Sequence, residues 1–295
     1  MTGGLGPAAR ATVEAVLAGE RRGAVVEADN LDLLAVLPDG VVDLAYGDPP
    51  FATGAARRLQ SIRLGAGDRS RPGFRGQATR YEVTSDLAYE DSLPLSEHLA
   101  ALRARVEAIH RVLAPRGSLY LHVDWRTVHH ARLLLDDVFG PERFLNEIVW
   151  AYDFGGRAPD RWPRKHDTIL WYAKGDAWIF NRDAVDRIPY MAPGLVGPDK
   201  AARGKLPTDV WWMTIVPPGG TERTGYPTQK PVRLLERIVA SSSRPGDLVL
   251  DPYAGSGTTG VAAARLGRRW LLVDRNPSAV AIAQRRLEAE LGADV

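Results

Sequence analysis

The chain has 295 residues and a net charge of +2; 45% of its residues are hydrophobic, 25% are charged and none is cysteine. This composition indicates a globular protein with ample core, and it excludes disulfides, thiolate zinc sites and cysteine nucleophiles. No apolar run reaches the roughly 18 residues that a membrane span needs, and the N-terminus does not resemble a signal peptide. We therefore expect a cytoplasmic protein without a membrane partner.

The first predicted elements in chain order are a helix over 8–20, a strand over 23–30, a short helix over 31–37 and a buried strand over 41–47. Asp29 stands at the end of the first strand, where it either caps the following helix or binds a ligand. Asp48 follows the second strand. If these strands are parallel neighbours, both carboxylates lie at the same edge of the sheet.

The second strand leads into Asp48-Pro49-Pro50-Phe51. Two prolines stiffen the backbone at the carboxyl end of a strand, which is where open α/β sheets bind ligands. The carboxylate of Asp48, the carbonyl of Pro49 and the ring of Phe51 suit a planar base with an exocyclic amine, because they offer two acceptors and a stacking face. A strand that ends in a proline-rich turn with a capping aspartate explains the same four residues equally well.

The segment 52–92 lacks periodicity and is rich in Gly, Arg and Ser; between residues 52 and 80 it has seven arginines and one acid. We predict a long basic loop that contacts DNA phosphates through Arg57, Arg58 and Arg63. A solvated loop with accidental arginines is the alternative.

The middle of the chain is predicted to hold a helix over 95–113, a strand over 118–123, a helix over 127–139 and two antiparallel strands over 146–152 and 168–173. The connection between those two strands carries Arg164 and Lys165, which we expect beside the basic loop. Prolines and tryptophans then mark 176–225 as an insertion that could meet a target. His129 and His130, in the helix over 127–139, have no metal-ligand company, and we predict no metal site.

The last part is predicted to contain a helix over 232–242, a strand over 248–250, a glycine loop over 251–260, a helix over 261–266, a strand over 270–273 and a helix over 279–291. A strand, glycine loop, helix and strand that end in an acid, Asp274, are typical of the nucleotide-binding half of a doubly wound fold. An NAD-dependent dehydrogenase is therefore one candidate.

Two features count against a dinucleotide site. Asp251 follows the strand and three residues separate it from Gly255, whereas a dinucleotide turn normally places glycine directly after the strand. A carboxylate there suits a cationic group instead. Only 21 residues follow Asp274, so the remaining strands lie upstream. We expect the strand ends at Asp251, Asp274, Asp29 and Asp48, in this succession, to line one rim of a mostly parallel sheet.

The motifs DPPF, RKHDTILWYAK, YPTQKP and DPYAGSGTT, in this order, resemble those of the amino-group DNA methyltransferases that depend on S-adenosylmethionine. The catalytic motif precedes the cofactor motif, as in the circularly permuted β group. The resemblance implies a Rossmann-like α/β domain made of 1–175 and 226–295, with 176–225 as a target-recognition insertion. Phe51 is a departure, because the family more often has tyrosine there.

The resemblance also implies roles for individual residues. The catalytic residues would be Asp48, Pro49, Pro50 and Phe51, and the residues that hold the methionine part of the cofactor would be Asp251, Gly255, Gly257, Thr258 and Thr259. Tyr253 would be a further cofactor-binding residue. Lys230 would help with the cofactor carboxylate and Asp274 would bind the ribose hydroxyls. Asp29 would bind the adenine amine, with Asn30 beside it.

We predict methylation of adenine N6 in double-stranded DNA after base flipping, because cytosine-N4 members of the family usually carry serine at the position of Asp48. Cytosine-N4 methylation is one alternative, and a catalytically silent DNA-binding protein is another. A homodimer and a cognate restriction endonuclease stay open as partners, and DNA as substrate places the protein at the nucleoid.

Overall fold

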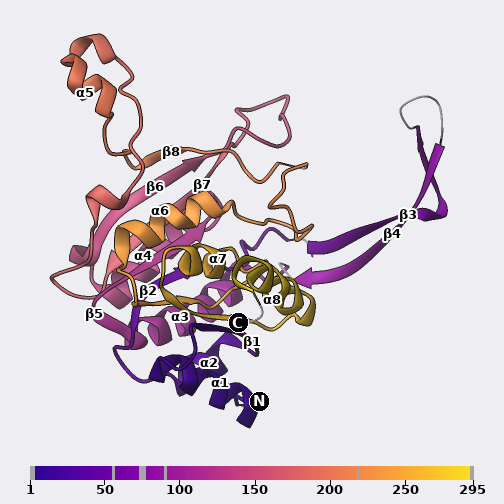
Figure 1. Cartoon of the computed structure of the whole chain (residues 1–295), viewed down its shortest axis with the longest axis horizontal. Coiled ribbons are helices and arrows are strands. Elements are labelled where there is room, and N and C mark those ends of the chain that lie inside the picture. Colours follow the sequence, from indigo (N-terminus) through magenta and orange to yellow (C-terminus); the bar gives the residue numbers. More distant parts are fainter. Residues whose placement is uncertain (1–3, 55–56, 73–77, 90–91, 218, 293–295) are drawn as a thin grey trace.

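A computed structural model of the chain describes residues 4–54, 57–72, 78–89, 92–217 and 219–292. Its centre is an eight-stranded sheet with the strand order β1-β10-β9-β2-β5-β7-β6-β8 (Figure 1). These strands are β1 (Gly23–Glu27), β2 (Val42–Gly47), β5 (Leu113–Val123), β6 (Phe144–Ala151), β7 (His166–Ala173), β8 (Val210–Trp212), β9 (Leu248–Asp251) and β10 (Arg269–Asp274). Within the described ranges no helix is long and apolar enough to cross a membrane.

The strands β1, β10, β9, β2 and β5 run parallel, and β7 lies antiparallel to both β5 and β6. Parallel strands are covered on both faces and therefore favour continuous apolar runs. The strand β9 fits this rule, since it is buried along its whole length. The predicted doubly wound, mostly parallel sheet with an antiparallel hairpin is confirmed.

Helices cover the sheet on both faces (Figure 1). One face carries α1 (Pro7–Ala18), α2 (Asn30–Val36), α3 (Leu95–Val112) and α4 (Val128–Phe139), which is followed by the 3-10 turn η1 (Pro141–Arg143), and the other carries α6 (Val232–Ser242), α7 (Thr258–Arg265) and α8 (Pro277–Leu291). Side chains alternate between the faces along a strand. In β10, Leu271 and Val273 join the core beneath α1–α4, whereas Trp270 and Leu272 join the core beneath α6–α8.

The predicted neighbourhood of Asp29 and Asp48 is wrong in one respect. Their strands β1 and β2 are not adjacent, because β10 and β9 lie between them. The strand β1 also ends at Glu27, and Asn30 already begins α2. All the strand ends still meet at one rim of the sheet, in the spatial order Asp29, Asp274, Asp251 and Asp48. Order along the chain does not determine order in the sheet when helical crossovers join parallel strands.

The prediction of an irregular basic loop over 52–92 is also wrong. This segment contains the long antiparallel strands β3 (Arg57–Pro72) and β4 (Ala78–Tyr89), which form a two-stranded sheet of their own. Their register shifts where both Leu64 and Arg69 align with Tyr81. The pair projects away from the main sheet (Figure 1). Sequence periodicity reports an apolar face, and a ladder of backbone hydrogen bonds can form without one.

The segment 176–225 is irregular but not detached from the main sheet. Its strand β8 pairs in parallel with β6 and places Trp211 opposite Trp150. Trp211 is buried against the guanidinium of Arg237, whereas Trp212 is exposed. The other described elements are the 3-10 turns η2 (Arg182–Ala184) and η3 (Pro193–Leu195) and the helix α5 (Pro198–Arg203), which stands at the end of a projection (Figure 1).

Candidate active site

The carboxyl ends of the parallel strands open into one cavity of about 310 Å³. All four residues of the DPPF segment (48–51) line it. So do the following residues from the other predicted cofactor positions: Asp29, Asn30, Lys230, Asp251, Tyr253, Gly255, Thr258, Thr259 and Asp274. The early and late motifs, far apart in the chain, therefore face the same space. Within the described ranges no group of three or more acidic or histidine side chains is placed to hold a metal ion.

Gly257 belongs to the glycine loop but is not among the residues that line the cavity. Its φ is +74°, and a Cβ at this position would lie 2.7 Å from the Cβ of Ala283. Glycine therefore permits both the turn into α7 and the close approach of α8. Gly255, with φ of +49°, does line the cavity, and a Cβ there would lie 3.1 Å from the ring of Tyr226.

Asp251 is a buried carboxylate at the end of β9. It accepts hydrogen bonds from the N–H of Tyr253 (2.9 Å) and from the hydroxyl of Thr259 (2.5 Å). Burial raises the pKa of Asp251 to about 7, in spite of these two hydrogen bonds. The ionised form of a buried carboxylate is stabilised by a cationic group that binds beside it. Asp251 is thus suited to a positively charged ligand group.

Asp274 occupies the corresponding place at the end of β10. Its carboxylate accepts the N–H of Gly255 and the N–H of Asn276, each at 2.9 Å. Burial raises the pKa of Asp274, although these backbone hydrogen bonds oppose the shift. The first of them ties the glycine loop to the neighbouring strand, so the loop and the acid have a fixed relative position.

Asp29 caps α2, since its side chain accepts the N–H of Leu31 at 2.9 Å. It also pairs with Arg105 of α3 at 3.2 Å, a residue that sequence reasoning missed. Arg105 donates to the amide oxygen of Asn30 (2.7 Å), and the amide nitrogen of Asn30 donates to the carbonyl of Pro252 (2.9 Å). This chain of contacts connects α3 to the glycine loop. The cap found here and a role in ligand binding are compatible, because Asp29 also lines the cavity.

Asp48 is paired with Lys230. The Nζ of Lys230 donates to Oδ2 of Asp48 at 2.6 Å and lies 5.3 Å from the centre of the Phe51 ring. The backbone of Lys230 is held from the other side, because its carbonyl accepts the hydroxyl of Thr258 at 3.1 Å. The lysine therefore spans the space between the glycine loop and the DPPF segment.

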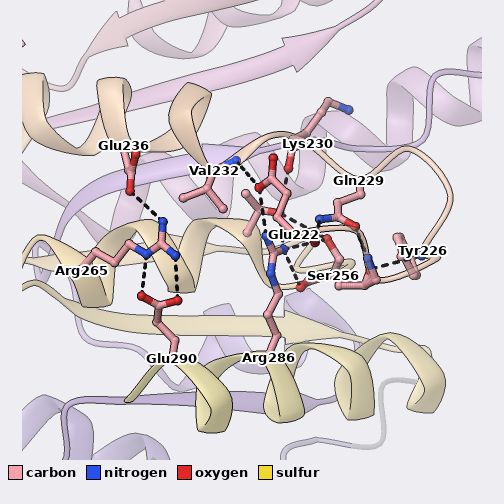
Figure 2. A network of polar contacts seen from close by, with 12 residues as sticks. Glu222, Tyr226, Gln229, Lys230, Val232, Glu236, Ser256, Arg265, Arg286 and Glu290 are labelled. Carbon is pink, nitrogen blue, oxygen red and sulfur yellow. Dashed lines mark hydrogen bonds and ion pairs between the residues drawn. The ribbon is translucent and has the colours of Figure 1, made fainter. Parts of the chain in front are cut away.

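A network of polar contacts fixes the loop that carries Lys230 (Figure 2). Arg286 of α8 donates to the hydroxyl of Thr258 (2.8 Å) and lies 3.5 Å from Glu222. Glu222 accepts the N–H of Val232 (3.1 Å) through its carboxylate and the amide of Gln229 (2.7 Å) through its carbonyl. Burial lowers the pKa of Arg286. Figure 2 shows the ammonium of Lys230 pointing away from these contacts.

The ring of Phe51 packs against a buried histidine, His122. His122 stacks against the Phe51 ring at a centroid distance of 6.1 Å. Its Nδ1 lies 2.8 Å from the hydroxyl of Tyr46, and its Nε2 lies 3.2 Å from Asp167. Burial alone would raise the pKa of Asp167, but its contacts with His122 and Tyr152 hold it below the usual value. The sequence predicted the strand of His122 but gave no signal for this role.

Of the predicted DNA contacts, Arg164 and Lys165 are not among the residues that line the cavity. The side chains of Arg57, Arg58 and Arg63 are outside the part of the structure that describes side chains, and only their place in β3 is known. Arg164 stacks over Trp125, with its Cζ 3.5 Å from the ring centre. Lys165 donates to the carbonyl of Gly155 at 2.6 Å, within the connection that carries both residues.

Comparison with known proteins places the chain in a family. A family model for adenine-N6 and cytosine-N4 enzymes, described as "DNA methylase", matches residues 42–285. The type II methyltransferase M.BglII of Bacillus subtilis is 30% identical over 281 residues, which cover 90% of this chain and 69% of the relative. The type II methyltransferase M.HpaI of Haemophilus parainfluenzae is 31% identical over 202 residues, which cover 68% of this chain and 63% of the relative.

Solved structures show the same fold at lower identity. The PvuII DNA methyltransferase, described as cytosine-N4-specific, has a TM-score of 0.63 at 18% identity, with 93% of this chain and 88% of that chain covered. The complex of M1.HpyAVI with S-adenosylmethionine has a TM-score of 0.58 at 20% identity, with 90% and 98% covered. The chain belongs to the DNA methylase family, whose members methylate exocyclic amines of adenine or cytosine. The family indicated by the sequence motifs is confirmed.

Proposed function

We propose that the chain transfers the methyl group of S-adenosylmethionine to the N6 amine of adenine in double-stranded DNA. The observation that supports this most is the shared cavity, with the DPPF segment on one side and the glycine loop on the other. A base inside a duplex cannot reach such a cavity, so the target base has to flip out of the stack first.

The residues at the cofactor end of the cavity fit S-adenosylmethionine. Asp251 is a buried carboxylate with a raised pKa and suits the ammonium of the methionine part. Asp274 suits the ribose hydroxyls, and Asp29 with Asn30 suits the adenine ring. We assign the rest of the methionine part to Tyr253, Gly255, Thr258 and Thr259, while Gly257 shapes the turn into α7.

When bound, S-adenosylmethionine supplies an electrophilic methyl group on a sulfonium. An exocyclic amine of a base is a weak nucleophile, because its lone pair is delocalised into the ring. Asp48 and the carbonyl of Pro49 accept its two N–H groups and favour a tetrahedral nitrogen. The nitrogen–methyl bond forms as the sulfur–methyl bond breaks, and the extra proton leaves to Asp48 or to water. Stacking on Phe51, worth roughly 1–3 kcal/mol, offsets part of the cost of flipping.

The choice of adenine over cytosine depends on Asp48, since cytosine-N4 members of the family usually have serine at that position. Cytosine N4 is the second candidate, because the cytosine-specific PvuII enzyme shares the fold. A protein that binds DNA without methylating it is the third. Arg57, Arg58, Arg63, Arg164 and Lys165 stay predicted phosphate contacts, and a homodimer stays a prediction. Because M.BglII and M.HpaI are type II methyltransferases, we propose that this activity protects DNA from a cognate restriction endonuclease.

The test is expression in a host that lacks DNA methylation, followed by sequencing that detects methylated bases. We expect N6-methyladenine in one sequence context with the wild type and none with Asp48→Ala. The purified Asp48→Ala variant should lose methyl transfer by roughly 1000-fold or more and bind S-adenosylmethionine within about 3-fold of wild type. N4-methylcytosine would establish the second candidate. Cofactor binding by the wild type without any methylated base would contradict the proposal and favour the third.

A further inference from the structure

Lys230 joins the two ends of the cavity. Its carbonyl is held by Thr258 at the start of α7, and its ammonium is held by Asp48. Both side chains of the ion pair are largely buried, with 9% of Lys230 and 18% of Asp48 exposed. The ammonium also lies 5.3 Å from the centre of the Phe51 ring. One lysine therefore covers the carboxylate and the ring that the proposed reaction uses.

This contact competes with the proposed substrate. Asp48 has to accept an N–H of the target amine, and Phe51 has to receive the flipped base. A lysine ammonium is itself an N–H donor and carries a full positive charge, so its hydrogen bond to a carboxylate is stronger than that of a neutral amine. While Lys230 donates to Oδ2 of Asp48, a flipped base can take this position only by breaking the charged contact.

We propose that Lys230 is a positioning residue that makes the cofactor bind before the flipped base. Its ammonium covers Asp48 until the carboxylate of the bound cofactor takes the ammonium. This inference rests on the proposed function and deepens it. The hydrogen bond from Thr258 fixes the backbone of Lys230 beside the glycine loop, so the side chain starts at the cofactor end. A lysine side chain is flexible, and its ammonium can exchange one anion for another within the same cavity.

If Lys230 covers Asp48 in this way, the binding of the cofactor and the binding of the flipped base are coupled. If the cofactor draws Lys230 away from Asp48, it raises the affinity for the flipped base. By linkage, DNA then raises the affinity for the cofactor by the same factor. Removal of the ammonium abolishes this coupling, whereas a lysine that only stabilises the fold would leave the coupling unchanged.

The test uses an oligonucleotide with the sequence methylated in vivo and fluorescent 2-aminopurine directly beside the target base. The target then keeps its exocyclic amine, and the fluorescence of its neighbour rises when the target leaves the stack. Sinefungin serves as a cofactor analogue without a transferable methyl group. Wild type should flip the base strongly only with sinefungin. Lys230→Met should flip the base without sinefungin. The DNA concentration at the midpoint of its titration should be roughly 10- to 100-fold lower than for wild type under the same conditions. Lys230→Arg should keep the cofactor dependence.

Lys174→Met is the matched control. The ammonium of Lys174 is partly buried and donates to the carbonyl of His110 at 2.5 Å, away from the cavity. Flipping by this control should depend on sinefungin as in wild type.

Flipping by Lys230→Met that still requires sinefungin would overturn the inference. If this variant does not fold, the measurement on the wild type tests the inference. Equal base flipping by the wild type with and without sinefungin would contradict the proposal that Lys230 covers Asp48. An absence of any methylated sequence in vivo contradicts the proposed function instead, and is seen before the oligonucleotide is designed.

Discussion

The two loops that face each other across the cavity are held in different ways. The glycine loop is fixed by the fold: the hydroxyl of Thr259 binds Asp251, the N–H of Gly255 binds Asp274, and the carbonyl of Pro252 accepts from Asn30. The DPPF segment is stiffened by its prolines, but its carboxylate is held by the side chain of Lys230. Backbone and core contacts orient the anions at the cofactor end, whereas an exchangeable side chain holds the anion at the catalytic end.

The largest effect that would test this comparison is expected from Asp251→Asn. The substitution keeps the size of the side chain and removes the charge that suits a cationic ligand group. Affinity for S-adenosylmethionine should fall roughly 100-fold or more, as measured by calorimetry. Base flipping in the absence of cofactor should stay at the wild-type level, because Asp48 and Lys230 are untouched. Unchanged cofactor affinity would show that Asp251 does not bind the ammonium.

The pH dependence of cofactor binding should follow the same carboxylate. Because the pKa of Asp251 is about 7 and a cation binds its ionised form, affinity should fall below pH 7 by up to about tenfold per pH unit. Calorimetry between pH 5 and pH 8 measures this slope. Asp251→Asn provides the control, since a slope that persists in this variant belongs to another group.

Stability of the cofactor-free protein should change in the opposite direction. The pKa of Asp251 is raised in the folded state, so its contribution is present below the unfolded pKa of 3.8 and is lost as pH rises to about 7. Asp251→Asn should therefore melt above wild type at pH 8, and the difference should shrink towards pH 5. A difference that does not depend on pH would contradict the raised pKa.

A smaller effect is expected from the contacts behind the glycine loop. Arg286→Met removes the contacts to Thr258 and Glu222 and should weaken cofactor binding by about 5- to 10-fold. Arg265→Met is the matched control, because the ion pairs of Arg265 with Glu236 and Glu290 join the same layer of helices but do not involve the glycine loop (Figure 2). Equal loss of cofactor affinity in both variants would point to a general loss of stability.

The smallest effect is expected from Phe51→Tyr. The ring keeps its stacking face, and His122 supports it from the other side. Steady-state turnover should stay within about 2-fold of wild type. A larger change in turnover, in either direction, would mean that the added hydroxyl interacts with the buried side chains of His122 and Asp167.

The sequence was informative wherever structure is local. An apolar run followed by glycine or proline located β2 and β9, and the acids Asp48, Asp251 and Asp274 follow from those strand ends. The adjacency of β2 and β9 was not predictable, because crossover helices allow several sheet orders. The pairing of Asp48 with Lys230 was also missed, since nothing near either residue in the chain signals the other.

The roles of two arginines on amphipathic helices were also not predictable from the sequence. Arg105 and Arg286 lie on α3 and α8, where charged residues are normally interpreted as solvent-facing. In the structure both reach the loops around the cavity. Their role depends on how two helices are oriented against the sheet, and this information is not present in either helix alone.

The pairing of β1 with β10 has a consequence for biosynthesis. Gly23 aligns with Trp270 and Glu27 aligns with Asp274, so the ribosome makes β1 long before its partner strand. Until that partner emerges, the apolar side chains of β1 have no neighbouring strand to complete their side of the sheet. Contacts of such long sequence separation form slowly. We therefore expect the nascent chain to acquire its cofactor pocket only after β10 has left the ribosome.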